Sequence, residues 1–403
     1  MKHLLQLYLN SYRGLSKQAW MLALIMLINR SGAMVVPFLS VYMTQSLHFS
    51  LKETGAVLSF FGLGAVSGSY LGGWLSDRIG HFRIQLSCLL LCVPVFCILP
   101  LFRSPEALSA GVFILSLVSE TFRPANSLSI VSYSTPESLT KAFSLNRMAM
   151  NLGFSIGPAL GGFLAAVSYH FLFYGNAITC GAAALVFFLY FRRRSGDDVP
   201  VKDEKEESNI QAAAPGRSPW KDFYFLIFSV LCCLYNICFF QLLNTLPLFY
   251  REVHHLNESD IGLILAYSGL VVFSLEMLIV HIADRRMSAG SAIVLGTLAC
   301  GASYSMLLLP GKFLLLYTAM FLLCISEILA MPFMGTVTMR RASQGTQGAY
   351  MGMNALSFSL AHVLSPLIGT RVADSLGFTS LWAATGTVAI LTTLGFWFVG
   401  RRI

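Results

Sequence analysis

Twelve long apolar stretches divide this chain, and they narrow its fold class more than any other feature. Each is about as long as the roughly 20 residues that an α-helix needs to cross the hydrocarbon core of a bilayer. Charged residues make up 11% of the chain, against roughly 25% in a soluble domain. We therefore predict an all-α, multi-pass membrane protein with helices at 18–44, 53–76, 81–101, 107–133, 140–168, 170–191, 221–249, 259–282, 289–309, 313–338, 346–372 and 377–399.

Lysine and arginine are distributed unevenly over the connections between these stretches. If the N-terminus is cytoplasmic, 20 of the 27 Lys and Arg lie on the cytoplasmic side, five lie outside, and Arg30 and Arg123 lie within the membrane. Cytoplasmic loops of membrane proteins carry such an excess. The pattern predicts that both termini are cytoplasmic, and it accounts for the net charge of +8 without nucleic acid. Residues 1–10 lack an apolar core with a cleavage site, so we expect no cleaved signal.

Ionisable residues near the middle of apolar stretches are the first candidates for function. Each costs roughly 2.5–3.5 kcal/mol at the centre of a spanning helix and therefore needs a polar surrounding. Glu120 and Arg123 share a helix face, so they can partly neutralise each other, and Glu120 is also the nearest candidate partner for Arg30. We predict a polar cavity lined by Asn29, Arg30, Glu120, Arg123, Gln241, Asn244 and Glu327, with Glu276 as a further ionisable candidate.

The chain repeats itself at an offset of about 207 residues. Ser119-Glu120 is matched by Ser326-Glu327, and each pair is followed by a proline. Asp77-Arg78 is matched by Asp284-Arg285, and further matches at 207 or 208 residues are Gly55 with Gly262, Gly62 with Gly269, Asn146 with Asn354, Pro158 with Pro366 and Gly161 with Gly369. The segment between the halves is charged and poor in large apolar residues, which is typical of a mobile linker. We predict two six-helix halves, 1–191 and 221–403, joined by a cytoplasmic linker at 192–220.

Two motifs carry a resemblance to a known family. The loop Gly73-Trp-Leu-Ser-Asp77-Arg78-Ile-Gly80 after the second stretch resembles the signature loop between helices 2 and 3 of the major facilitator superfamily, although His81 and Phe82 stand where basic residues are usual. The fifth stretch, with Gly153, Gly157, Pro158 and Gly161, resembles the antiporter motif of that superfamily, and the further upstream glycine of that motif is replaced by Ser144. Small residues at four-residue spacing let helices approach closely.

The resemblance implies a fold and a class of function. It implies two pseudo-symmetric six-helix bundles in which helices 1, 4, 7 and 10 line a central cavity. Gates and close helix packing are assigned to Gly73, Asp77, Arg78, Gly80, Gly153, Gly157, Pro158, Gly161, Asp284 and Arg285. An arginine favours the charged form of a neighbouring carboxylate, so we expect Glu327, which has none close in sequence, to take up a proton more readily than Glu120.

These observations favour a proton-coupled secondary transporter that works by alternating access. An exporter (antiporter) of small organic or amphiphilic compounds, similar to the drug:proton antiporters, is the preferred interpretation. The alternatives are a proton-coupled importer of a polar metabolite or short peptide, whose carboxylate would bind Arg30 or Arg123, and a membrane sensor that transports nothing. We expect a monomer whose partners are its substrate, protons and the lipid bilayer. The compact loops favour a bacterial inner membrane.

Enzyme and cofactor functions lack their sequence signals. His254, His255 and Glu258 do not have the helical spacing of a zinc protease, and neither a nucleophile elbow nor a Walker loop is present. The nine cysteines lie in apolar stretches, and none forms a CxxC pair with a nearby His or Asp. We interpret them as core residues. We expect neither a bound metal nor a cofactor.

Overall fold

The computed structural model describes residues 15–135, 138–192, 218–311, 313–342 and 347–400. Within these ranges all regular structure is helical, and no strand is present. Most of the predicted linker, the segment before residue 15 and the residues after 400 lie outside the described residues, and so does the side chain of Asp77.

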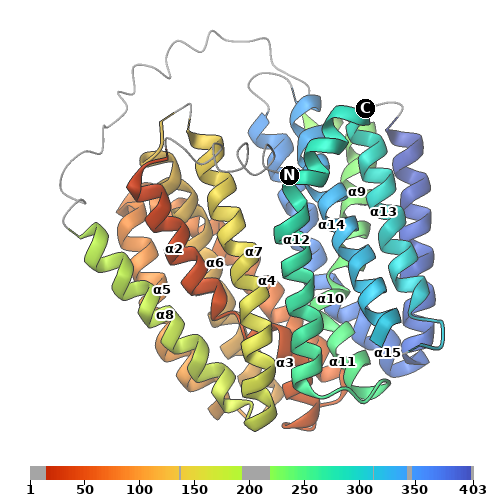
Figure 1. Cartoon of the computed structure of the whole chain (residues 1–403), viewed down its shortest axis with the longest axis horizontal. Coiled ribbons are helices and arrows are strands. Elements are labelled where there is room, and N and C mark those ends of the chain that lie inside the picture. The colour runs from red at the N-terminus through yellow and green to blue at the C-terminus, as the bar shows by residue number, and fades with distance from the viewer. Residues whose placement is uncertain (1–14, 136–137, 193–217, 312, 343–346, 401–403) are drawn as a thin grey trace, which may run out of the picture. The chain divides into compact units, whose positions relative to one another are not determined.

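The helices follow the twelve predicted stretches closely (Figure 1). Three stretches hold more than one element: the first holds two helices, the third holds a helix and a 3-10 turn, and the seventh holds a 3-10 turn followed by three helices. The elements are α2 (Lys17–Ser31), α3 (Val35–Gln45), α4 (Leu51–Ile79), α5 (His81–Ile98), η1 (Leu99–Leu101), α6 (Pro105–Ser132), α7 (Leu139–Val167), α8 (His170–Phe191), η3 (Pro219–Lys221), α9 (Phe223–Phe239), α10 (Gln241–Asn244), α11 (Leu246–Glu252), α12 (Glu258–Arg286), α13 (Ala289–Met306), α14 (Phe313–Arg341) and α15 (Gln347–Val399).

Among the residues that the structure describes, ten segments are long and apolar enough to cross a membrane. The last of them, Tyr350–Val399, contains two helices that meet at Gly377, where φ is +81° and the helical path is interrupted. Glycine adopts this backbone conformation at low cost because it has no Cβ. The 28-residue helix α6 is not among the ten, because the polar residues around Glu120 lower its mean hydropathy. With α6 counted and the last segment divided, the predicted helices are confirmed.

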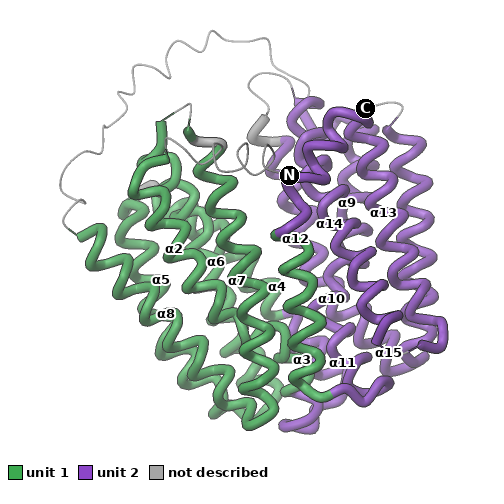
Figure 2. The backbone as a smooth tube through the Cα atoms, in the orientation of Figure 1, with its two compact units in different colours: residues 1–42, 60–199, 257–273 green, residues 43–59, 200–256, 274–403 purple. Residues whose placement is uncertain are grey.

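Contacts divide the chain into two compact units (Figure 2). Unit 1 contains residues 1–42, 60–199 and 257–273, and unit 2 contains residues 43–59, 200–256 and 274–403. The division cuts across α4 and α12, as the change of colour along α12 shows in Figure 2. The sequence-based division at the linker follows the order of the chain, and it stays a prediction.

In unit 1, glycines allow α4 to lie directly on α6. A Cβ added to Gly64 would come within 2.5 Å of the carbonyl oxygen of Phe113, and one added to Gly72 would come equally close to that of Thr121. The hydroxyl of Thr121 donates a hydrogen bond of 3.1 Å to the carbonyl of Gly68. Small residues at this spacing allow backbone-to-backbone contact without a hydrophobic driving force. The face of α4 that carries Gly64, Gly68 and Gly72 is therefore the face that packs against α6.

In unit 2, large aromatic side chains fill the space between α9, α13 and α15. The indole of Trp382 is fully buried and stacks on Tyr304, with ring centroids 5.4 Å apart and planes at 14°. Phe249 of α11 meets the same indole edge to face at 5.2 Å. Such aromatic pairs contribute roughly 0.5–1.5 kcal/mol beyond the area they bury. They fix the position of the short helix α11 against α15.

The internal repeat appears in the turns before α4 and α12. His48 and His255, which are 207 residues apart, are the two non-glycine residues with positive φ among the described residues (56° and 53°). The amide of Phe49 bonds the carbonyl of Met43 at 2.9 Å, and 207 residues later Leu256 bonds Tyr250 at 3.0 Å. The sequence offset therefore marks a repeat of backbone geometry as well as of residue type.

Candidate functional site

The first membrane span is broken beside its central arginine. Helix α2 ends at Ser31, and the turn 32–34 leads into α3. The side-chain oxygen of Asn176 on α8 accepts hydrogen bonds from the amides of Met34 (3.0 Å) and Val35 (3.2 Å). These are two of the amides that a new helix leaves without intrahelical partners. One buried asparagine thus stabilises the break, and Arg30 lies in the last turn of α2.

The glycines of α7 determine how closely α2 approaches, and Figure 1 shows the two helices side by side. A Cβ on Gly153 would lie 2.6 Å from the Cβ of Arg30, and one on Gly157 would lie 3.1 Å from its carbonyl oxygen. Gly161 continues the same face against Met34 and Phe38. The residues that resemble the antiporter motif therefore surround the backbone of Arg30.

A second face of α7 packs against the first half of α12, which also belongs to unit 1. A Cβ on Gly162 would lie 2.5 Å from the carbonyl oxygen of Glu258, and Gly262 approaches the carbonyl of Pro158 as closely. The hydroxyl of Ser155 donates a 2.8 Å hydrogen bond to the carbonyl of Ala266. Pro158 thus belongs to a helix contact formed by small residues on both sides.

Arg30, Asn29 and Glu120 line one cavity of about 80 Å³ in unit 1. The Nε atom of Arg30 is shielded from solvent and has no hydrogen-bond acceptor among the described residues. Its charge is attracted by Glu120 and repelled by Arg123. The amide of Asn29 bonds the Cys180 sulfur at 3.7 Å. The other lining residues are Ala33, Val36, Phe61, Cys88, Leu89, Cys92, Phe96, Leu115, Ser119, Phe122, Asn176 and Cys180.

Glu120 forms an ion pair with Arg123 one turn further along α6. The Arg123 Nη1 atom lies 3.2 Å from the Glu120 Oε2 atom. The Glu120 side chain is 14% exposed and that of Arg123 is 52% exposed, so the acid borders the cavity while its partner points away from the core. The pairing expected from their i, i+3 spacing is present.

The predicted cavity residues of the second half lie in unit 2. Gln241 is buried and donates a 3.1 Å hydrogen bond to the carbonyl of Ser365 on α15. The Asn244 amide bonds the hydroxyl of the same serine at 3.2 Å. Both side chains therefore bridge the broken seventh span to α15. Glu327 is partly buried and lies close enough to Tyr235 to influence its phenol, which hydrogen-bonds Ser326 at 3.0 Å. Glu276 is also partly buried.

The predicted gate residues lie at helix ends. Gly80 precedes α5 with φ of +91°, a conformation that favours glycine. The Arg78 guanidinium lies 4.2 Å from the centre of the Trp74 ring, a cation–π contact, and Gly73 faces open space. In unit 2, Asp284 and Arg285 are exposed at the end of α12.

Two polar clusters were missed by the sequence analysis. Ser129 of α6 bonds both the His81 ring (2.8 Å) and the amide of Gln85 on α5. In unit 2, Asp222 before α9 receives two hydrogen bonds from Arg341 at the end of α14, 2.8 and 3.2 Å long, and one of 3.1 Å from Tyr350 of α15. We call this second group the Asp222 clamp. The sequence gives no local signal for it, because its members are 119 or more residues from Asp222.

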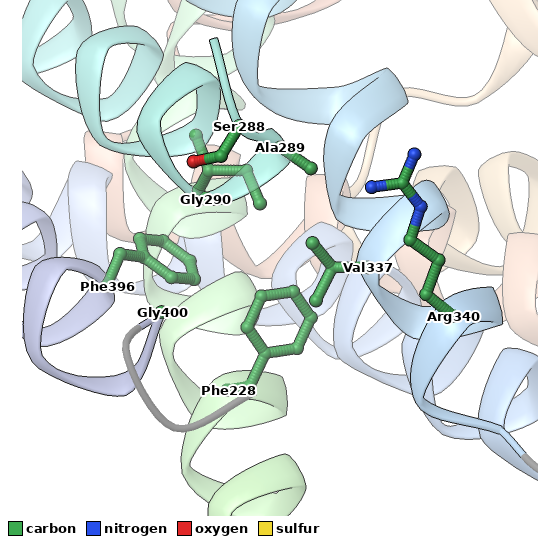
Figure 3. Close-up of a pocket in the computed structure, with 9 residues that line it drawn as sticks. Phe228, Ser288, Ala289, Gly290, Val337, Arg340, Phe396 and Gly400 are labelled. Atoms are coloured by element: carbon green, nitrogen blue, oxygen red, sulfur yellow. The ribbon is translucent and has the colours of Figure 1, made fainter. Parts of the chain in front are cut away.

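A larger cavity of about 170 Å³ lies in unit 2 at the start of α13. Figure 3 shows the rings of Phe228 and Phe396 there, together with Val337 and the guanidinium of Arg340. None of the site residues predicted from the sequence lines this cavity. No group of three or more His, Cys, Asp or Glu suited to a metal ion occurs among the residues that the structure describes.

Comparison with known proteins identifies the family. The model of the Major Facilitator Superfamily matches residues 19–366. The chain belongs to the Major Facilitator Superfamily. Its members are membrane transporters and not enzymes, so this chain is a multi-pass membrane protein that binds small-molecule substrates. The predictions of the family, of the all-α fold with twelve membrane helices and of a non-enzymatic function are confirmed.

Individual superfamily members are similar to this chain at low identity. An uncharacterised MFS-type transporter of Bacillus subtilis, YttB, is 26% identical over 88% of each chain. Multidrug resistance protein MdtH of Edwardsiella ictaluri is 22% identical over 90% of this chain and 89% of that protein. Among solved structures, the peptide transporter POT superposes with a TM-score of 0.81 at 18% identity, over 97% of this chain and 96% of that one. At that identity the likeness concerns the fold.

Proposed function

We propose that this superfamily member is a proton-coupled antiporter that exports small organic compounds. The observation that carries the proposal is the cavity of unit 1, which Arg30 and Glu120 line together within spanning helices. Charges placed there are expensive, and in membrane proteins they mark substrate or ion pathways. A purely structural role would leave the free Arg30 Nε atom unexplained.

The two halves divide the work between them. In unit 1 the carboxylate of Glu120 is paired with Arg123, which favours its charged form. We therefore assign the substrate contacts, and not the coupling proton, to unit 1. At the positions equivalent to Arg30 and Arg123, unit 2 has Ile237 and Ala330. We therefore assign the coupling proton to Glu327, with Glu276 as the second candidate. Protonation of Glu327 then alternates with substrate binding as the cavity opens to one side and then to the other.

Export is favoured over import by α7. Its glycine and proline residues resemble the antiporter motif, and α7 packs against α2 with one face and against α12 with another, so a shift of either helix also displaces α7. The name of the relative MdtH points in the same direction. We place the linker and both termini in the cytoplasm because of the excess of Lys and Arg there, and we expect a monomer in a bacterial inner membrane.

Vesicle transport tests this proposal. Purified protein is reconstituted, and a panel of drugs and organic acids is assayed in vesicles with an imposed pH gradient and in vesicles in which a protonophore has collapsed it. Gradient-dependent movement of at least one compound, in the direction opposite to the protons, is expected. Movement that ignores the gradient, or that runs in the same direction as the protons, overturns the antiporter proposal.

A further inference from the structure

The charges around the unit 1 cavity do not balance. Arg30 and Glu120 line the cavity, and Arg123 does not. Among the described residues Glu120 forms its ion pair with Arg123, and Arg30 has no ion pair. The charge of Glu120 is therefore neutralised from outside the cavity, and the positive charge of Arg30 has no partner. An uncompensated charge within spanning helices is costly, so the arrangement is completed by a mobile negative group.

The position of the free donor shows where that group would bind. The Arg30 Nε atom is shielded from solvent, and no acceptor among the described residues reaches it. A guanidinium presents several N–H donors in a fixed planar fork, which matches a carboxylate or phosphate-like group with two oxygens. Asn29 lines the same cavity, and its amide has a second N–H besides the one that bonds Cys180.

Apart from Ser119, Glu120, Asn176 and three cysteines, the remaining walls of the cavity are apolar. Phe61, Phe96 and Phe122 line it together with Leu89 and Leu115. Its volume of about 80 Å³ corresponds to several water molecules at roughly 10–15 Å³ each. Because Arg123 neutralises Glu120, the cavity combines one unpaired cation, Arg30, with aromatic and aliphatic walls, which suits a small ligand with an anionic group and an apolar body.

We propose that this cavity binds organic anions, with the anionic group on Arg30 and the apolar body against the phenylalanines. The proposal rests on the proposed transport function and names the substrate class of that site. It differs from the general expectation of amphiphilic drugs, because cationic compounds, the usual counterparts of an acidic cavity, would meet the unpaired positive charge of Arg30 here.

Four ligands of matched shape test the charge rule on the unmodified protein. Benzoate, benzenesulfonate, benzamide and benzylamine are added to the full chain in lipid nanodiscs without any gradient, and binding is measured by equilibrium dialysis. Both anions should bind at least tenfold more tightly than benzamide and benzylamine. Equal binding of benzamide and benzoate, or stronger binding of benzylamine, overturns the proposal. If chloride at the same concentration as benzoate displaces the benzoate completely, the site takes any small anion, and the assignment to organic anions is wrong.

Variants then locate the contact. Arg30→Gln should reduce benzoate affinity at least tenfold, Arg30→Lys should reduce it less because the point charge remains, and Arg103→Gln, at an exposed position away from the cavity, should leave it unchanged. Unchanged affinity in Arg30→Gln overturns the assignment. If this variant does not fold, the charge ranking on the unmodified protein still decides. Benzoate binding without gradient-driven transport would contradict the proposed function alone, whereas transport of another compound without benzoate binding would contradict only this inference.

Discussion

Arg30 and Glu120 acquire their roles from neighbours that no local sequence pattern reveals. In the sequence they are 90 residues apart, and only the cost of an isolated charge in a membrane suggested that they meet. The structure adds two residues. The side chain of Asn176 accepts hydrogen bonds at the helix break beside Arg30, and the sulfur of Cys180 accepts one from the Asn29 amide. An asparagine or cysteine in an apolar helix is common in packed interiors, so neither could have been selected from the sequence.

The first prediction separates the two acids. Glu327→Gln should abolish transport driven by a pH gradient while substrate binding or exchange remains, because the glutamine cannot release a proton. Glu120→Gln should instead lower the melting temperature of the purified protein, because it leaves Arg123 without its carboxylate partner at 3.2 Å. Gradient-driven and exchange transport in vesicles check the first effect, and thermal unfolding in detergent checks the second. If Glu327→Gln still responds fully to the gradient, Glu276 becomes the coupling candidate.

At the scale of elements, length and hydropathy predicted the spans but not their internal breaks. The first span is interrupted at 32–34 and the seventh at Phe240 and Thr245. Those breaks depend on groups from other helices, such as Asn176 for the first and Ser365 for the seventh. Close packing of the fifth span was predicted from the spacing of its glycines, because close contact of two helices requires small residues in one register.

A second prediction concerns the contact between α7 and α2. Gly153→Ala would place a Cβ 2.6 Å from the Arg30 Cβ. Either α2 moves away from α7 or the new methyl group overlaps the Arg30 side chain. We expect a loss of about 1–3 kcal/mol in stability together with weaker substrate binding, measured by thermal unfolding and by ligand-induced stabilisation. Gly335→Ala is the matched control, because nothing lies within 4 Å of its added Cβ, and it should be neutral or slightly stabilising. Equal effects of the two substitutions would contradict the proposed packing.

The Asp222 clamp gives a pH-dependent prediction. Hydrogen bonds from Arg341 hold the pKa of the Asp222 carboxyl below its ordinary value, and the amide of Phe225 and the hydroxyl of Tyr350 act in the same direction. A lowered pKa means that the stabilisation is complete above the ordinary carboxyl pKa of about 3.9 and is lost as the pH falls through the lower folded value. Asp222→Asn should therefore be less stable than the unmodified protein at pH 7 by about 1.5–3 kcal/mol, and the difference should shrink in acid.

Adjacent arginines provide the control for the clamp. Arg341→Gln should destabilise unit 2 as Asp222→Asn does, whereas Arg340→Gln should not, since Arg340 is exposed and the described residues give it no ion pair or hydrogen bond. Thermal unfolding at pH 7 and at about pH 2.5, below the ordinary carboxyl pKa of about 3.9, measures both. A difference between Asp222→Asn and the unmodified protein that does not depend on pH would mean that the carboxylate charge contributes nothing.

At the scale of the whole molecule, the repeat of about 207 residues is the feature that sequence and structure share most fully. It relates the acids Glu120 and Glu327, and it also relates His48 to His255 with the same backbone conformation. The capping bonds that follow agree as well: the Glu53 amide bonds Ser50 at 3.2 Å, and the Asp260 amide bonds Asn257 at 2.8 Å. Two copies of one fold that each cross the membrane six times place their first and last residues on one side.

That parity can be tested directly. A reporter that is active only in the cytoplasm, fused after Arg194 or after Arg402, should give signal at both sites, because an even number of spans precedes each. The same reporter fused after Arg103, between η1 and α6, should be silent, because three spans precede it. The excess of Lys and Arg on the linker side fixes the sign of this pattern. Signal after Arg103 with silence at the other two sites would mean that the orientation is reversed. Signal after only one of Arg194 and Arg402 would mean an odd number of spans between them. Two equivalent halves would then have no basis.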